Sequence, residues 1–377
     1  MKALYWRSNQ VSTPQLVAVA VLAVIGLGAL ELRPSRERDP LYEQKLQAAR
    51  LAENAFRAIN VERIRLQIPI DRELDPASSG LIGPPYSPIV SNEGNLTAKQ
   101  TSANPNFAAA FVEMFHEAGV RRGSVVTGNL TGSFPAMNVA VCAALQVLGA
   151  RPIFVSSVAA SEHGATHPSL TWPDMERLLV EQGILSFRSR AVSMGGAQDR
   201  ARSHSEEGRE LIRAAVERSG LPLMSPGDFD EAVQMRIDLF ERARGDSPVV
   251  AYVNVGGGTA SVGTADDKSR FRPGLNVSLP RGLQHRSVMR HYLEQGVPVV
   301  HVSDIREIAR AHGLPEAPVE TPSAGEGGVF VRTVVPPWAI ALVLALILGA
   351  MYLATRFDLL ASFAGKKDKP APPEPMI

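Results

Sequence analysis

The chain has 377 residues, 45% of them hydrophobic and 20% charged, and a formal net charge of only +1 at pH 7. Proteins that bind nucleic acid usually carry a clustered basic excess, so nucleic acid is not expected as a partner. The single cysteine, Cys142, excludes both a disulfide framework and a cysteine metal site within one chain.

Two uncharged apolar segments, one near each end of the chain, predict transmembrane helices. The first contains QLVAVAVLAVIGLGAL and the second VVPPWAIALVLALILGAMYLAT. Each has roughly the 20 apolar residues that a helix needs to cross a bilayer, and we place the helices over residues 13–32 and 334–355. A cleaved signal peptide is the alternative for the first segment, since Gly26 and Gly28 suit a cleavage site. A buried core helix is the alternative for the second.

The charges that flank these segments predict their orientation. Lys2 and Arg7 precede the first segment, and several basic residues follow the second. Basic flanks favour the cytoplasmic side. We therefore expect a cytoplasmic start over residues 1–12, a flexible cytoplasmic tail over residues 356–377 and an extracytoplasmic body. The alternative is the reverse topology, with a cytoplasmic nucleotide-binding body.

The residues between the two segments predict an α/β body. Apolar residues at helical spacing predict an amphipathic helix over residues 39–66, and a Pro- and Gly-rich loop follows over residues 67–104. Over residues 105–313, short apolar runs alternate with amphipathic helical patterns. This alternation indicates a Rossmann-like α/β domain whose mainly parallel sheet is covered by helices on both faces. A linker follows over residues 314–332.

The stretch VNVGGGTASVG, residues 253–263, follows an apolar run and raises the question of a nucleotide site. Gly258 and Gly263 have the spacing of a phosphate-binding loop, but Thr264 stands where a lysine is needed. In the dinucleotide-binding motif, Ser261 replaces the third glycine. Both motifs fail at a residue that carries the chemistry, and no cofactor is expected.

The same glycines still leave backbone amides free to meet an anion. Ligands of open α/β sheets bind at the carboxyl ends of the strands, where a second loop, TGNLTGSFP, also lies. Nearby guanidinium groups suit carboxylates. The predicted ligand-binding residues are Gly256, Gly257, Gly258, Thr259, Ser261, Thr131, Gly132, Ser133, Arg270 and Arg281. The alternatives are a strand-end turn beside solvated arginines and a simple helix cap at Ser133.

Three residues are candidates for catalysis. Glu162 and His163, in the loop SEHGATHPSLTWPDME, are candidates for proton transfer, and Ser133 is the third. His163 and His167 lie four residues apart, but without a clear third ligand they do not predict a metal site. A further loop, SMGGAQDRARSHSEEG, is interpreted as a glycine-rich turn with a salt-bridged pair. Catalytic signatures such as GxSxG and HExxH are absent from the sequence.

The whole layout resembles the poly-γ-glutamate system protein family of bacterial membrane proteins. The resemblance lies in the MKALYWR start before an apolar segment, in TGNLTGSFPAMNVAV, SEHGATHPSLTWPDM, VNVGGGTAS and PRGL, and in the terminal apolar segment. It covers most of the chain.

This resemblance implies an accessory protein of poly-γ-glutamate biosynthesis or export, and thus of capsule biosynthesis, in the bacterial cell membrane. The implied partners are the membrane, the synthesis subunits and the anionic polymer, whose carboxylates suit amides and arginines. It implies no reaction and no catalytic residues. The alternative function is that of an extracytoplasmic hydrolase or transferase acting on γ-glutamyl or related acidic substrates.

Overall fold

The computed structural model describes residues 13–32 and 35–356, and contacts divide the chain into two compact units. One unit, the helical unit, joins the two ends of the chain, and the other, the body, is Asp39–Phe330. The predicted cytoplasmic start and all of the predicted tail except Arg356 lie outside the described residues.

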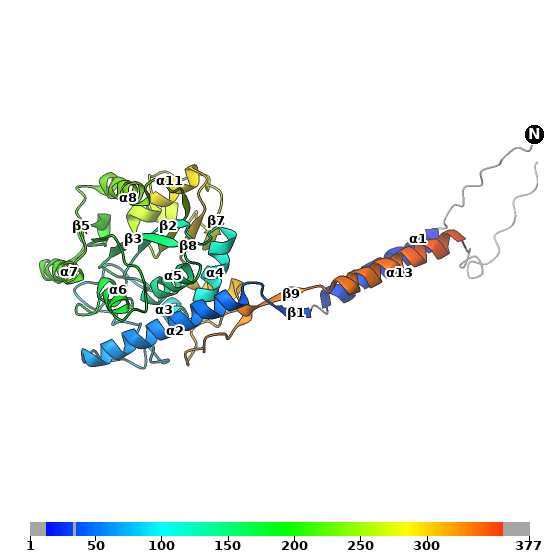
Figure 1. Ribbon diagram of the computed structural model, residues 1–377, viewed down its shortest axis with the longest axis horizontal. Helices are drawn as coiled ribbons and strands as arrows, with labels where there is room; N and C mark the ends of the chain where they lie inside the picture. The colour runs from blue at the N-terminus through cyan, green and yellow to red at the C-terminus, as the bar shows by residue number, and fades with distance from the viewer. Residues whose placement is uncertain (1–12, 33–34, 357–377) are drawn as a thin grey trace, which may run out of the picture. The chain divides into compact units, whose positions relative to one another are not determined.

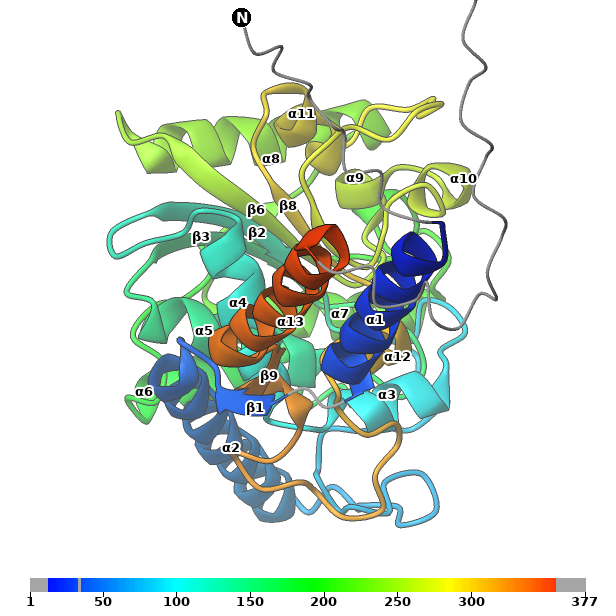
Figure 2. The same cartoon turned by 90° about the vertical axis from the view of Figure 1, so that its right-hand side faces the viewer.

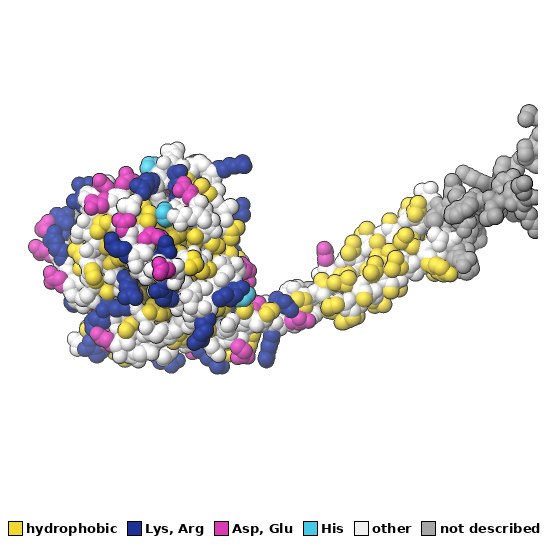
Figure 3. All heavy atoms as spheres, turned by 45° about the horizontal axis from the view of Figure 1, so that its top comes forward, with side chains coloured by type: hydrophobic (Ala, Val, Ile, Leu, Met, Phe, Trp, Pro, Cys, Tyr) yellow, Lys and Arg dark blue, Asp and Glu magenta, His cyan; other side chains and the backbone are white. Residues whose placement is uncertain are grey.

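The helical unit contains two apolar helices and a short two-stranded sheet. The helices are α1 (Thr13–Leu32) and α13 (Pro337–Arg356), and β1 (Ser35–Arg38) pairs antiparallel with β9 (Val331–Val334). Hydrophobic side chains cover most of the surface of both helices (Figure 3). Both helices are long and apolar enough to cross a membrane, although a signal sequence would pass the same test as α1.

The two apolar helices approach each other closely at Gly26. A Cβ atom added to Gly26 of α1 would lie 2.7 Å from Val343 Cγ1 of α13, too short for two carbon atoms. Small residues allow such close approach between membrane helices. None of the apolar window of α13 is buried inside the structure, which excludes the buried-core-helix alternative. The helix begins at Pro337 rather than at residue 334, because residues 331–334 pair as β9.

The body is built on a seven-stranded sheet in which only the edge strand β7 is antiparallel to its neighbour, among the described residues. In spatial order the strands are β5 (Leu223–Met224), β4 (Ala191–Ser193), β3 (Arg151–Ser157), β2 (Val125–Leu130), β6 (Val249–Val255), β8 (Val299–Val302) and β7 (Gly274–Asn276). The predicted mainly parallel sheet is confirmed. Strands β5 and β7 are too short to produce an apolar run in the sequence.

Helices cover both faces of the sheet. Successive side chains of the central strands point to opposite faces and therefore pack in two different cores. On β2, Val126 packs in the larger core and Val125 in the second; on β6, Val253 and Tyr252 divide in the same way. The larger core contains residues of α2 (Tyr42–Arg65), α4 (Phe107–Glu117), α5 (Pro135–Val147), α6 (Trp172–Glu181) and α12 (Ile305–Ala311). The second contains residues of α8 (Phe229–Arg244) and α11 (Val288–Glu294). Figures 1 and 2 show these two layers on opposite sides of the sheet.

The folded body extends beyond the predicted α/β domain, residues 105–313, at both ends. The helix α2 occupies most of the predicted helix 39–66 and packs in the larger core. In the predicted linker, residues 314–332, Val329 and Phe330 are buried in the same core. The predicted helix and the predicted linker up to Phe330 therefore belong to the body, whereas Val331 and Arg332 belong to β9 of the helical unit.

A single buried lysine ties the two ends of the body together. Lys45 of α2 lies with Nζ 3.0 Å from Asp39 Oδ2 and 2.6 Å from Glu113 Oε2 of α4. It also donates to the Val329 carbonyl at 2.9 Å, and the Asp39 amide donates to the Phe330 carbonyl at 3.1 Å. The first and last residues of the body are thus neighbours.

The segment predicted as a loop, residues 67–104, contains the helix α3 (Leu96–Ser102). The Asn95 side chain caps this helix by accepting from the Ala98 amide at 2.8 Å. The buried Arg63 of α2 fixes an earlier part of the segment through three backbone carbonyls. A helix of seven residues has about two turns, so its pattern is lost among the surrounding Pro, Gly, Ser and Asn residues.

Candidate functional site

The order of the strands reverses between β2 and β6. From β2 the chain moves outward through β3, β4 and β5, and it returns to the other side of β2 as β6 before it reaches β8. In open α/β sheets, ligands bind in the crevice beyond the carboxyl ends of the strands at such a reversal. A cavity of about 1040 Å³ is lined by residues that follow β2, β3, β4, β6 and β8. The loops singled out from the sequence therefore meet around one cavity.

The three glycines that follow β6, residues 256–258, form the glycine loop. Gly256 has a φ of +88°, and a Cβ atom added to it would lie 2.3 Å from Thr131 Oγ1. A Cβ atom on Gly258 would lie 3.0 Å from Asn129 Nδ2. At Gly256, glycine is thus required both by the backbone conformation and by close contact with Thr131, whereas Gly258 has an ordinary negative φ and only its contact with Asn129 is tight.

A lysine lies against the glycine loop. Lys268 ends the short helix α10 (Ala265–Lys268), and its Nζ would lie 3.1 Å from a Cβ atom added to Gly257. Within the described residues, Lys268 forms no ion pair, and the amides of Gly257 and Gly258 donate to no protein acceptor. The Thr259 hydroxyl is also buried without a partner in the described part of the chain. The glycine loop thus presents donors beside a cation.

Most of the predicted ligand-binding residues line the cavity. They are Gly256, Gly257, Gly258, Thr259, Ser261, Thr131 and Ser133. Gly132, Arg270 and Arg281 lie outside its lining. Both arginines are exposed, and Arg270 Nη1 donates to the Arg281 carbonyl at 3.4 Å. Lys268 rather than either arginine is the cation placed at the glycine loop.

A buried ion pair connects the loops around the cavity. Arg236 of α8, only 2% exposed, places Nη2 2.6 Å from Asp199 Oδ2. Asp199 Oδ1 accepts from the Ser193 hydroxyl at 2.7 Å, and Arg236 Nε donates to Asn129 Oδ1 at 3.3 Å. The two charges compensate each other, so the pair holds the ends of β2 and β4 together without adding net charge.

The turn that carries Asp199 has an unusual backbone. Gln198 and Asp199 have φ values of +54° and +62°, and Gly195 and Gly196 also have positive φ. Each non-glycine residue in this region costs on the order of 1–3 kcal/mol, so surrounding contacts must hold the turn. The predicted glycine-rich turn is present, but the salt bridge of Asp199 is formed with Arg236 of α8 and not with a residue of the same loop.

A second lysine, Lys99 of α3, is buried in the lining of the cavity. It is 2% exposed, and its Nζ donates to Ser161 Oγ at 2.8 Å and to the Ser133 carbonyl. The Nζ also lies 4.0 Å from the centre of the Phe134 ring. Burial lowers the pKa of Lys99 to about 7, against the opposing charge of Glu162. Near neutral pH the amine is therefore present in both protonation states.

Ser133 does not cap α5. The helix begins at Pro135, its N-cap position is Phe134, and no side chain among the described residues caps it. The Ser133 hydroxyl instead accepts from the Ser161 amide at 3.0 Å. The simple-cap alternative is therefore wrong, because the helix begins one residue too late for Ser133 to occupy the cap position.

The other two catalytic candidates, Glu162 and His163, lie outside the lining of the cavity. Glu162 Oε2 accepts from the Gly94 amide at 3.1 Å. Burial lowers the pKa of His163, which favours the neutral ring. In the described part of the chain, no group of three or more His, Cys, Asp and Glu side chains could hold a metal ion. Of the three candidates, Ser133 is the one that lines the cavity.

Sequence reasoning missed Lys99, Lys268 and Arg236. A signal existed for Arg236, because it lies between Ala232 and Phe240 at helical spacing, on the apolar face of α8. A charge on such a face requires a buried partner. For Lys99 the signal was the Asn95 cap that begins α3.

Comparisons with protein-family models, with curated proteins and with solved structures found no match to this chain. The cavity and the two apolar helices are therefore the basis for a function.

Proposed function

We propose that this chain is a membrane-anchored accessory protein of poly-γ-glutamate biosynthesis or export, with a Rossmann-like body that binds the anionic polymer. The observation that carries the binding site is Lys268, which lies without an ion-pair partner among the described residues, beside the glycine loop. Amide donors and one ammonium group suit a carboxylate. The resemblance described above supplies the polymer and the synthesis subunits as partners.

The charges of the lining limit how the polymer binds. Glu93, Asp304 and Glu307 also line the cavity, so it is not uniformly basic. The proposal therefore places one carboxylate of the polymer at the glycine loop, rather than a long polyanion along an electropositive groove. We propose that the body lies outside the cytoplasm, as the basic flanks of the apolar segments predict.

Polymer binding tests the site. We expect the full-length protein in detergent to bind poly-γ-glutamate, and Lys268→Gln to weaken binding about 10-fold to 100-fold, because a hydrogen bond to a charged group contributes about 1.5–3 kcal/mol. Affinity should fall as salt is added. Isothermal titration calorimetry measures both effects, with the neutral methyl ester of the polymer as the ligand control.

Two arginines provide matched variants for this experiment. Arg270→Gln and Arg281→Gln each remove one nearby positive charge outside the lining of the cavity, so each should change affinity less than Lys268→Gln. A larger loss in the arginine variants would move the site away from the glycine loop. Absence of binding by the wild-type protein would overturn the proposal.

The orientation can be measured by cysteine labelling. The natural thiol, Cys142, is fully buried, so the wild-type protein serves as the unlabelled background. We expect Ser247→Cys, at an exposed turn of the body, to react with a membrane-impermeant maleimide in intact bacterial cells once any outer barrier is removed. Reaction after lysis alone would place the body in the cytoplasm and favour the reverse topology.

A further inference from the structure

Lys99 differs from an ordinary structural lysine in its partners. Buried charges are normally paired, yet within the described residues Lys99 has no carboxylate partner. Its Nζ contacts a serine hydroxyl, a backbone carbonyl and an aromatic ring. The neighbouring Glu162 directs Oε2 to the Gly94 amide instead. The amine is thus held in the lining of the cavity without a compensating charge in contact.

Ser161, on the loop after β3, is held opposite this amine. Its Oγ lies 2.8 Å from Lys99 Nζ, a distance at which a proton can be transferred. Its amide donates to Ser133 Oγ at 3.0 Å, and its carbonyl accepts from the Gly164 amide at 3.1 Å. Among the described residues, Lys99 is the hydrogen-bond partner of the Ser161 hydroxyl. Backbone contacts on both sides therefore fix a serine that lines the cavity.

We propose that Ser161 and Lys99 form a nucleophile and general base that cleave or transfer the acyl group of an amide or ester bound in the cavity. A hydroxyl activated by a neighbouring base is the general requirement for such a nucleophile. The glycine loop and Lys268 line the same cavity, so the preferred substrate carries a carboxylate. This choice of substrate rests on the proposed function, whereas the Ser161–Lys99 pair does not.

The reaction follows from the positions of the two side chains. The neutral amine of Lys99 takes the hydroxyl proton of Ser161 while Oγ bonds to the substrate carbonyl carbon. The carbonyl π electrons move onto the oxygen, which gives a tetrahedral intermediate. When these electrons re-form the C=O bond, the C–N or C–O bond of the substrate breaks, and the leaving group takes the proton from Lys99. Water then adds to the acyl-serine, giving its proton to Lys99, which returns that proton to Ser161 Oγ as the acid leaves. An amine in place of water gives acyl transfer.

The carbonyl oxygen gains negative charge during both attacks and needs hydrogen-bond donors. The helix α5 begins at Pro135, two residues after Ser133, whose hydroxyl holds the Ser161 amide. The first-turn amides of a helix have no acceptor within the helix. Pro135 has no N–H, however, and Ala136 and Met137 are buried outside the lining of the cavity, so the donors that line it are the amides of Gly257 and Gly258 in the glycine loop.

Several charged groups surround the amine. Glu162 and His163 follow Ser161 directly, and the charge of Glu162 opposes the effect of burial on the pKa of Lys99. Glu93 precedes α3, while Asp304 and Glu307 belong to the start of α12, which packs against α3. None of these carboxylates forms an ion pair with Lys99 in the described residues.

A fluorophosphonate tests the pair directly, because serine nucleophiles displace its fluoride and keep the phosphorus. We expect the full-length protein in detergent to gain one adduct, located on Ser161 by peptide mass spectrometry. Ser161→Ala should abolish labelling, and Lys99→Met should slow it at least about 100-fold, the usual scale of general-base catalysis. The matched control is Ser157→Ala, which removes another hydroxyl from the lining of the same cavity and should leave labelling unchanged.

The pH dependence of the wild-type protein gives a second measurement, which does not depend on a variant folding correctly. The base is the neutral amine, so the labelling rate should rise with pH and reach half its maximum near the Lys99 pKa of about 7. No adduct at pH 8, an adduct on another residue, or a rate that Lys99→Met leaves unchanged in a folded protein would overturn the pair.

Polymer binding separates this inference from the proposed function. Ser161→Ala retains the glycine loop and Lys268, so it should bind poly-γ-glutamate while it loses labelling. If the wild-type protein labels at Ser161 but binds no polymer, the proposed function fails and the acyl-transfer pair stands with another substrate. If it binds polymer but forms no adduct, the pair fails and the binding function stands.

Discussion

We expect Arg236→Met to lower the free energy of unfolding of the full-length protein by about 3–5 kcal/mol, the usual cost of removing one partner of a buried ion pair. Arg236 is 2% exposed, and its loss leaves the Asp199 carboxylate buried without its partner. Methionine keeps much of the apolar length of the side chain but lacks its charge and donors. Chemical denaturation in detergent, followed by tryptophan fluorescence, measures the change, because Trp172, one of the three tryptophans, is fully buried in the body.

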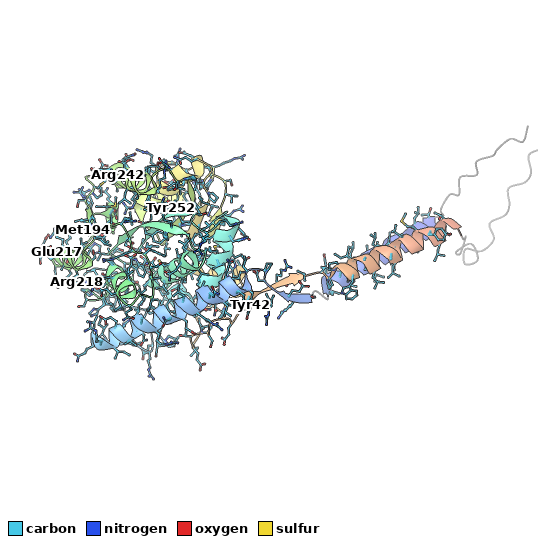
Figure 4. All side chains as sticks on the ribbon, in the orientation of Figure 1. Tyr42, Met194, Glu217, Arg218, Arg242 and Tyr252 are labelled. Atoms are coloured by element: carbon cyan, nitrogen blue, oxygen red, sulfur yellow. The ribbon has the colours of Figure 1, made fainter. Side chains whose placement is uncertain are left out.

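Arg242→Met is the matched control for this prediction. Arg242 belongs to the same helix but is exposed (Figure 4), so its loss should change stability by less than about 0.5 kcal/mol. Adding Asp199→Asn to Arg236→Met should recover part of the loss, because it removes the uncompensated charge. Equal unfolding free energies for the two arginine variants would show that the ion pair does not hold the loops together.

The second large effect is expected at the glycine loop, where Gly256→Ala should destabilise the body by about 2–5 kcal/mol. Alanine must adopt a φ of +88° and place its Cβ atom 2.3 Å from Thr131 Oγ1. The left-handed backbone costs about 1–2 kcal/mol, and the forced contact adds about 1–3 kcal/mol. The same denaturation experiment measures the loss, and polymer binding should weaken because the glycine loop must shift.

Two further variants separate the backbone cost from the contact. Gly220→Ala, at a φ of +66° with open space around the added Cβ atom, should show the backbone cost alone. Thr131→Ala combined with Gly256→Ala removes the clashing Oγ1 and should recover the contact cost, since the Thr131 Cβ lies at an ordinary 3.5 Å. A Gly256→Ala variant as stable as Gly220→Ala would mean that Thr131 does not constrain the loop.

The sheet was predictable because its central strands are long and buried on both faces. Strands β3 and β6 have seven residues each; β6, VVAYVNV, appears in the sequence as a nearly continuous apolar run, and β3, RPIFVSS, has a shorter apolar run at its centre. Strand β4 has only three residues, Ala191–Ser193, too few for a clear strand pattern in the sequence. Its length depends on pairing with β3 and β5, which local pattern does not encode.

The cations of the cavity were less predictable because they depend on short helices. Lys268 is placed by the four-residue helix α10, and Lys99 by the seven-residue α3, both too short for a clear apolar period. The capping pair Thr264 and Asp267 was the available signal for α10. Arg270 was predicted from the chemistry of its guanidinium group and from its proximity in sequence to the glycine loop, but it lies outside the lining of the cavity.

The contacts around Lys45 hold the first and last residues of the body side by side, as in domains that are inserted between two segments of another chain. The first residue of the body, Asp39, and its last, Phe330, share a backbone hydrogen bond of 3.1 Å, so the chain leaves the fold beside the point where it begins. Domains with adjacent ends can be inserted, exchanged or circularly permuted with little rearrangement of their hosts. Evolution or an engineer could therefore replace the body between β1 and β9 while keeping the same apolar helices.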